Sequence, residues 1–226
     1  MPPTPHLATP SIRLGYLGLV VFVLGVLWTA AHFTNSDGTH FNPLRNFVSE
    51  LGSERASPMS AVFSASILTS SLLFFPLVCM LAAQLSPRLR RYAIVTAVIS
   101  LIGCVTVSFA SMDYLKPHLV GSLLFFGGWL ATSFLFTVGL WHRHGFRHAP
   151  ALIFTGLLAA VSAAIFLTVL IIALIGFLNG AFQIPKNFQR PAVWDIAVLE
   201  WTVVLCFLLW TAAATLHLRR PAPTTP

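Results

Sequence analysis

The amino-acid sequence predicts an all-α fold, a polytopic membrane protein built as a bundle of six transmembrane helices. Of its 226 residues, 57% are hydrophobic and only 8% are charged, whereas ordinary globular proteins carry about 25% charged residues. The apolar residues also form long continuous runs, while the strands of a membrane barrel alternate apolar and polar residues. Because only helices and closed barrels can span a bilayer, helices remain. The composition excludes a water-soluble enzyme, a disordered chain and a disulfide-stapled secreted domain.

Six apolar runs reach the length of about 20 residues that a helix needs to cross a bilayer. They define one transmembrane domain over residues 14–218, with both ends of the chain on the same side of the membrane. The proline-bearing tails 1–13 and 219–226 are expected to be disordered. The expected spans are Leu14–Phe33, Met59–Gln84, Tyr92–Met112, Leu119–Leu140, Pro150–Leu178 and Ile196–Leu218.

The distribution of basic residues predicts the orientation of the bundle. The side that holds the two termini carries eight arginines, whereas the opposite side carries five basic residues together with all six acids, a net charge of −1. Because cytoplasmic loops retain Lys and Arg, both termini are expected in the cytoplasm and the first, third and fifth loops outside. The bases form no continuous stripe, so nucleic acid is not an expected partner. Membrane lipids are the expected partners, and a second membrane protein is an open alternative.

The first outer loop contains a segment, Asn42–Gly52, that is predicted to form a short helix. Asn42 is a good N-cap, Pro43 suits the first helical position and Gly52 suits the stop. An apolar stripe follows the helical spacing i, i+3, i+4, i+7 and consists of Leu44, Phe47, Val48 and Leu51. Such a helix is expected to lie on the outer membrane surface or to fold over the mouth of the bundle.

Ionisable residues gather at the outer ends of the spans and provide the candidate catalytic residues. Glu200 lies about 6 Å inside the sixth span, and an acid at that depth is costly unless it faces the bundle and has a partner. Asp113 and His118 bracket the short loop between the third and fourth spans, where the acid can orient the histidine as a general base. Ser49 adds a hydroxyl. We therefore expect Asp113, His118, Glu200 and Ser49 to meet in one outer pocket.

Four residues of the first loop are candidate binding residues for the same pocket: Arg45, Asn46, Glu50 and His40. His40, Glu50 and Glu200 also have side chains that zinc accepts as ligands. However, the sequence contains no His-x-x-x-His motif and no dense histidine cluster beside acids. No metal ligand is therefore assigned, and the identity of any cofactor is left open.

Two classes of function remain open for this pocket. The preferred interpretation is lipid head-group binding or membrane organisation without catalysis, for which a polar rim is sufficient. The alternative is an outer-leaflet lipid hydrolase that uses the Asp, His and Glu side chains with or without a metal, although no Gly-x-Ser-x-Gly motif is present. A transporter is less favoured, because no charge lies near mid-membrane and no pair of broken helices stands in matching halves.

Two short motifs carry a resemblance to a known family. The segment Asn42–Gly52 before an apolar span, followed by Asp113 and by His118-Leu119-Val120-Gly121, resembles the bacterial and archaeal six-helix family catalogued as domain of unknown function 998. In that family a Ser-x-Leu-Gly element follows the first span, and an acid and a histidine bracket the third hairpin. Glu200-Trp201 is also similar to the Glu-Trp pair of the FRAG/DRAM/Sfk membrane family, which is tied to lipid remodelling and membrane organisation. The resemblance implies a six-helix protein of the bacterial inner membrane and implies no reaction.

Overall fold

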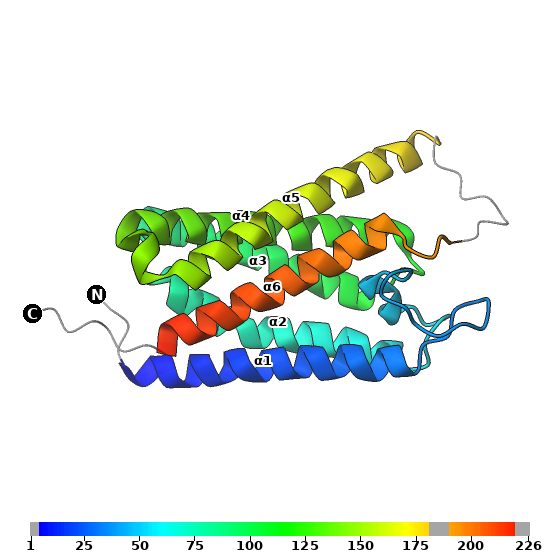
Figure 1. Ribbon diagram of the computed structural model, residues 1–226, viewed down its shortest axis with the longest axis horizontal. Coiled ribbons are helices and arrows are strands. Elements are labelled where there is room, and N and C mark those ends of the chain that lie inside the picture. The colour runs from blue at the N-terminus through cyan, green and yellow to red at the C-terminus, as the bar shows by residue number, and fades with distance from the viewer. Residues whose placement is uncertain (1–4, 181–189, 220–226) are drawn as a thin grey trace, which may run out of the picture.

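The computed structural model describes residues 5–180 and 190–219, and in this part of the chain six long helices form a bundle (Figure 1). Each of the six contains a segment long and apolar enough to cross a membrane, so the predicted all-α, six-span architecture is confirmed. The chain is an integral membrane protein. The helices are α1 (Pro5–Ala31), α2 (Ser60–Ala82), α3 (Pro87–Phe109), α4 (Leu115–His148), α5 (Pro150–Leu178) and α6 (Asp195–Arg219).

The six helices pack in the order of the chain. Each helix contacts the next one, and α1 also packs against α6, so the helices close into a ring in which α5 lies between α4 and α6. The start of α1 and the end of α6 lie at one end of the bundle, here called the terminal end (Figure 1). The connection 32–59 lies at the opposite end, here called the loop-1 end.

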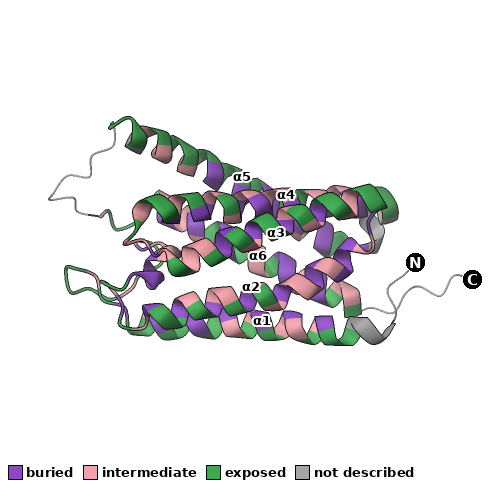
Figure 2. Ribbon diagram, turned by 180° about the vertical axis from the view of Figure 1, so that it is seen from behind, coloured by how far each residue is buried: buried purple, intermediate pink, exposed green. Residues whose placement is uncertain are grey.

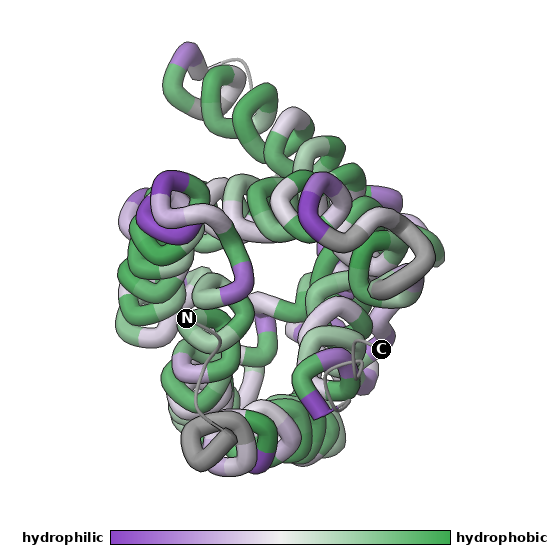
Figure 3. Tube along the Cα trace, turned by 90° about the vertical axis from the view of Figure 1, so that its left-hand side faces the viewer, coloured by the Kyte–Doolittle hydropathy of each residue, from purple (hydrophilic) through white to green (hydrophobic). Residues whose placement is uncertain are grey.

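The α5 helix leaves the ring on its way to the loop-1 end (Figures 1 and 3). The last two turns of α5 expose Ile171, Ile172, Ile175 and Leu178, each at least 45% accessible. Exposed residues also dominate this part of α5 in Figure 2. In a membrane protein such apolar surface faces the hydrocarbon of the bilayer, so its exposure does not mark an unfinished core.

The helices extend beyond the apolar runs that the sequence predicts. The α1 helix begins at Pro5, although the span was expected from Leu14, and α4 continues past the expected end at Leu140. Regular α4 geometry ends at Gly145, whose φ of 66° is not helical. The helices continue because no helix-terminating residue stands at the membrane boundary. The hydropathy pattern marks only the part of each helix that crosses the bilayer. Residues 1–4, 181–189 and 220–226 lie outside the described part, and so therefore do most of the predicted C-terminal tail and the middle of the fifth loop.

The predicted helix over Asn42–Gly52 is wrong in its first half. A turn replaces it there, and only Val48–Gly52 is helical, as a 3₁₀ helix called η1. The Asn42 side chain accepts a hydrogen bond from the Leu44 N–H (2.9 Å), and Phe47 has extended backbone angles that interrupt the helix. Asparagine side chains compete with the backbone in this way and so favour turns over helices. The η1 segment contacts α1, α2 and α6 and therefore closes the loop-1 end of the bundle. Of the two expected placements, it takes the one over the mouth of the bundle.

Close packing of α3 on α4 depends on glycine. A methyl group placed on Gly103 of α3 would overlap the backbone of Phe125, and one placed on Gly128 of α4 would lie 2.5 Å from the Ser100 nitrogen. Small residues at such interfaces let membrane helices approach closely, because packing and not water drives their association.

This packing generates a stability prediction. Gly103→Ala should lower the free energy of unfolding by about 1–3 kcal/mol, because the added methyl group forces α3 away from α4. Gly127→Ala is the matched control, since nothing lies within 4 Å of a methyl group there. Chemical denaturation of both variants in detergent micelles measures the difference. Equal stability of the two variants would contradict the close approach.

Candidate functional site

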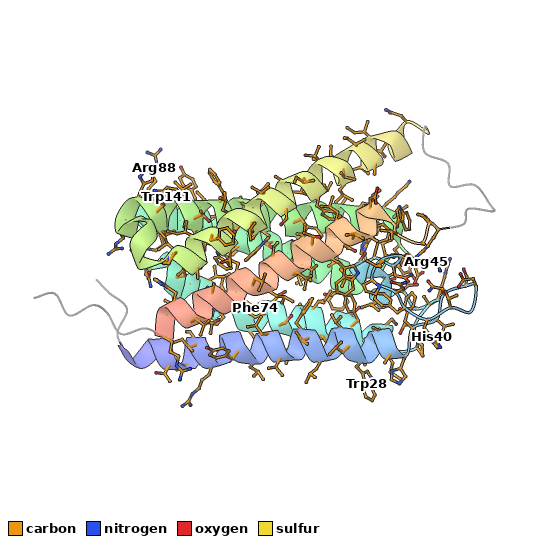
Figure 4. The ribbon with its side chains drawn as sticks, viewed as in Figure 1. Trp28, His40, Arg45, Phe74, Arg88 and Trp141 are labelled. Atoms are coloured by element: carbon orange, nitrogen blue, oxygen red, sulfur yellow. The ribbon has the colours of Figure 1, made fainter. Side chains whose placement is uncertain are left out.

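Buried polar side chains concentrate at the loop-1 end, on the first connection and on the adjoining ends of α4 and α6. Asn46, Glu50, His118 and Glu200 are each at least 93% buried there. Figure 4 shows the side chains at this end of the bundle, with Arg45 and His40 farther out in the first connection. The site therefore has an interior, made by η1 and the helices, and a rim made by the connection 32–47.

Glu200 joins α6 to the first loop. Its Oε2 atom accepts a hydrogen bond from the Val48 N–H at 2.8 Å, and the carboxyl group also accepts hydrogen bonds from the N–H and the hydroxyl of Ser49. The Val48 and Ser49 N–H groups start the 3₁₀ helix and have no partner within it. The sequence required a partner for an acid at this depth, and the structure supplies backbone and hydroxyl donors of η1.

A second buried acid, Glu50, is paired with an arginine from the segment before α6. Arg190 donates two hydrogen bonds to the Glu50 carboxylate, at 2.7 and 2.5 Å, and Asn46 Nδ2 donates a third at 2.9 Å. The Arg190 guanidinium also lies 5.3 Å from the centre of the Trp194 ring. Sequence reasoning missed Arg190, because nothing in the local pattern connects it to a residue 140 positions away. This bidentate pair neutralises Glu50 and fixes the loop against α6.

Asn46 fastens the first connection to the bundle. It is fully buried, and its side chain donates to Asn35 Oδ1 at 2.7 Å and accepts from the Asn42 N–H at 3.1 Å. Its backbone oxygen accepts a hydrogen bond from Trp201 Nε1 at 3.0 Å. The residue predicted as a binding group thus holds the loop in place.

Asp113 and His118 belong to different contacts, although we expected the acid to orient the histidine. Asp113 accepts hydrogen bonds from the Ser53 hydroxyl (3.0 Å) and the Glu54 N–H (2.9 Å), so it faces the first loop. His118 Nδ1 instead lies 2.9 Å from the backbone oxygen of Ala110. Because a carbonyl only accepts, Nδ1 carries the proton, and Nε2 of the neutral ring is left as an acceptor. A backbone carbonyl orients this histidine, which a sequence pattern of side chains does not reveal.

The interior of the site is a cavity with one polar end. Its volume is about 70 Å³, and Ser49, His118 and Glu200 line it near η1. The rest of its wall is largely aromatic and aliphatic, with Phe63, Ile67, Phe125, Trp129, Val203 and Phe207. None of its lining residues is Lys or Arg, in the part of the chain that the structure describes.

A second cavity of about 40 Å³ adjoins the first one on the side of the terminal end. The two share Ser71, Cys104, Phe125, Trp129 and Phe207 in their walls. Together they extend along α2 from Phe63 to Val78, which corresponds to about 22 Å of helix. Polar groups at one end and hydrocarbon walls along the remainder give this elongated cavity the polarity of an amphiphile.

The structure therefore divides the predicted site residues into three groups. Ser49, His118 and Glu200 meet at the cavity, whereas the expected pocket partners Asp113, Asn46 and Glu50 hold the first loop. Arg45 and His40 lie at the rim, where Arg45 pairs with Asp37 at 3.7 Å and His40 is exposed. Hydrogen bonds from the Thr39 hydroxyl and N–H hold the pKa of the exposed Asp37 below its usual value. Among the residues that the structure describes, no three His, Cys, Asp or Glu side chains are placed to hold a metal, and His40, Glu50 and Glu200 do not form the zinc site that was considered.

Comparison with known proteins gives one match. The model of a protein family of unknown function, DUF998, matches residues 16–217. The chain belongs to the DUF998 family. This match covers all six spans and confirms the family resemblance carried by the Asn42–Gly52 and Asp113–Gly121 motifs. Neither the curated proteins nor the solved structures contain a significant match. The similarity of Glu200-Trp201 to the FRAG/DRAM/Sfk family stays a prediction.

The Glu50–Arg190 pair of this DUF998 protein gives a second prediction. Arg190→Gln should reduce the free energy of unfolding by about 1.5–3 kcal/mol, because it leaves a buried carboxylate without its charged donors. The double variant Glu50→Gln/Arg190→Gln should lose less than the two single variants combined, since neighbouring groups couple. Denaturation in detergent measures all three. Arg45→Gln, which removes a longer contact (3.7 Å) to the exposed Asp37, serves as the control and should change stability little. Strictly additive losses at Glu50 and Arg190 would contradict the pairing.

Proposed function

We propose that this protein binds a membrane lipid, with one hydrocarbon chain in the elongated cavity and a polar group at Ser49, His118 and Glu200, and that it does so without catalysis. The observation that carries the proposal is the polarity of the two adjoining cavities, which have polar groups at the loop-1 end and largely apolar walls beyond it. A largely apolar pocket with a few convergent polar groups is the usual form of a small-molecule site. The hydrocarbon core around the bundle supplies such ligands.

The hydrogen-bond partners of Ser49, His118 and Asp113 favour binding over hydrolysis. A nucleophilic serine is usually activated by a histidine, whereas the Ser49 hydroxyl bonds to Glu200 and the backbone oxygen of Ala110 holds the His118 ring. Asp113 faces the first loop and does not support His118. The side chains that would have to act as a catalytic unit therefore make their contacts elsewhere.

One observation favours a lipid hydrolase as the second candidate. The backbone oxygen of Ala110 fixes the His118 ring, and the unprotonated Nε2 of a histidine held in this way is suited to activate water as a general base. Glu200 lines the same cavity. A hydrolase of this kind would release a fatty acid or head group from its ligand, whereas a binding protein would return it intact.

The proposal predicts that bulk added to the cavity wall removes the ligand. Ser71→Phe places a ring where the two cavities meet, while Leu72→Phe adds a ring to the neighbouring, 52% exposed position on the same helix. Purification in mild detergent followed by mass spectrometry should find a stoichiometric lipid with the wild type and with Leu72→Phe. With Ser71→Phe the lipid should fall at least about tenfold, which corresponds to a loss of about 1.4 kcal/mol of binding free energy.

Two outcomes of that measurement would reject the proposal. Equal lipid retention by both variants would place the ligand outside the cavity. Release of fatty acid from the bound lipid by the wild type, abolished in His118→Phe, would instead establish the hydrolase.

We also propose that the loop-1 end faces outward and that the termini lie in the cytoplasm, because cytoplasmic segments retain basic residues and the terminal side carries eight arginines. Ser36→Cys and Ser86→Cys test it, since both serines are exposed and lie at opposite ends of the bundle. An impermeant thiol reagent applied to intact cells should label Ser36→Cys and leave Ser86→Cys unlabelled. The wild type is the control, because its three cysteines lie within spans. The reverse labelling pattern would invert the orientation.

A further inference from the structure

Among the residues that the structure describes, no Lys or Arg stands in the wall at the polar end of the cavity to receive an anionic group. The arginines nearest to it in the first loop and before α6 are already paired, Arg190 with Glu50, Arg45 with Asp37 and Arg55 with Asp113. No Lys or Arg belongs to the described wall of the cavity. A phosphate or carboxylate placed there would be buried without a counter-charge and beside Glu200, which is strongly unfavourable.

The same end presents hydrogen-bond acceptors. Nε2 of His118 accepts, because Nδ1 carries the proton toward Ala110. An ionised Glu200 has about four lone-pair positions for hydrogen bonds, and three donors from Val48 and Ser49 already occupy positions on it. The carboxylate therefore has room for one more donor.

The other polar groups of the cavity wall do not alter the excess of hydrogen-bond acceptors at its polar end. The Ser70 hydroxyl donates to the Ile67 backbone oxygen, and Ser71 Oγ pairs with Cys104 Sγ at 3.1 Å. The indole nitrogen of Trp129 is a buried donor without a hydrogen-bond partner among the described residues, but it stands on α4 about three turns beyond His118 and therefore away from the polar end. Ser122 contributes one hydroxyl, which both donates and accepts.

We propose that the bound amphiphile carries a hydrogen-bond-donating head without negative charge, a hydroxyl or an ammonium group on a hydrocarbon chain. This inference rests on the proposed lipid-binding function and names the class of its ligand. The donor hydrogen lies between His118 Nε2 and the free position of the Glu200 carboxylate. Long-chain alcohols, partial glycerides and long-chain amines share this chemistry, whereas fatty acids and phospholipids that insert their phosphate do not.

Four probes with the same chain and different heads test the inference: dodecanol, dodecylamine, dodecanoate and dodecyl phosphate. Each is added at equal mole fraction to the delipidated full-length protein in detergent at neutral pH, and the melting temperature and the bound stoichiometry by native mass spectrometry are recorded. A ligand that binds only the folded state raises its melting temperature. Dodecanol and dodecylamine should bind and stabilise, and the two anions should not.

A variant separates recognition of the head from binding of the chain. His118→Asn keeps a short amide that can donate toward Ala110 but removes the Nε2 acceptor, so dodecanol affinity should fall about tenfold, the value of one hydrogen bond of roughly 1.4 kcal/mol. Asp195→Asn, at an exposed acid on the same end of α6, is the control and should bind as the wild type does.

The outcomes distinguish this inference from the function on which it rests. Equal binding of all four probes, preferential binding of an anion, or unchanged dodecanol affinity in His118→Asn would overturn the donor-head inference and leave lipid binding intact. Binding of none of the probes, together with equal lipid retention by Ser71→Phe and Leu72→Phe, would reject the lipid-binding function itself.

Discussion

The hydrogen bonds that Glu200 accepts from Val48 and Ser49 organise the loop-1 end of this protein. A carboxyl group about one turn inside a membrane helix needs donors, because the surrounding hydrocarbon offers none. The start of a 3₁₀ helix supplies unsatisfied N–H groups, and η1 therefore sits directly over the end of α6. Glu200 thus provides acceptors for the N–H groups at the start of η1, and these N–H groups provide donors for the buried carboxyl group.

The neighbouring contacts extend this arrangement around the opening of the bundle. Glu50 and Arg190 connect η1 to the chain that enters α6, and Asp113 connects the segment after η1 to the turn between α3 and α4. Because η1 is held on both sides, the cavity keeps its polar end beside η1 and its largely apolar walls along the helices. Glu50 and Asp113 are therefore structural supports of the site, while Ser49, His118 and Glu200 border its interior.

Packing of the remaining bundle sets the shape of that interior. Glycines bring α3 close to α4, whereas α5 lies between α4 and α6 and leaves the ring near the loop-1 end (Figure 1). Aromatic side chains from α4 and α6 meet edge to face in the middle of the bundle, with Trp129 4.2 Å from Phe207 and 4.9 Å from Trp210 between ring centres. These aromatic rings are large and rigid, so they form fixed walls around the cavity. The elongated cavity follows from this geometry.

The sequence by itself determined the architecture, because hydropathy and length are local properties and the bilayer imposes one solution on them. Six spans, the shared side of the termini and the polar character of the loop-1 end could all be predicted in this way. The acid–histidine pair and the long loop-one helix could not, because both depended on contacts between distant segments. Asn42 formed a turn, Asp113 faced Ser53, and Arg190 found Glu50 across 140 residues. Only the tertiary structure decided which polar groups border the cavity, since each buried group takes the nearest donor or acceptor in space and not the nearest in sequence.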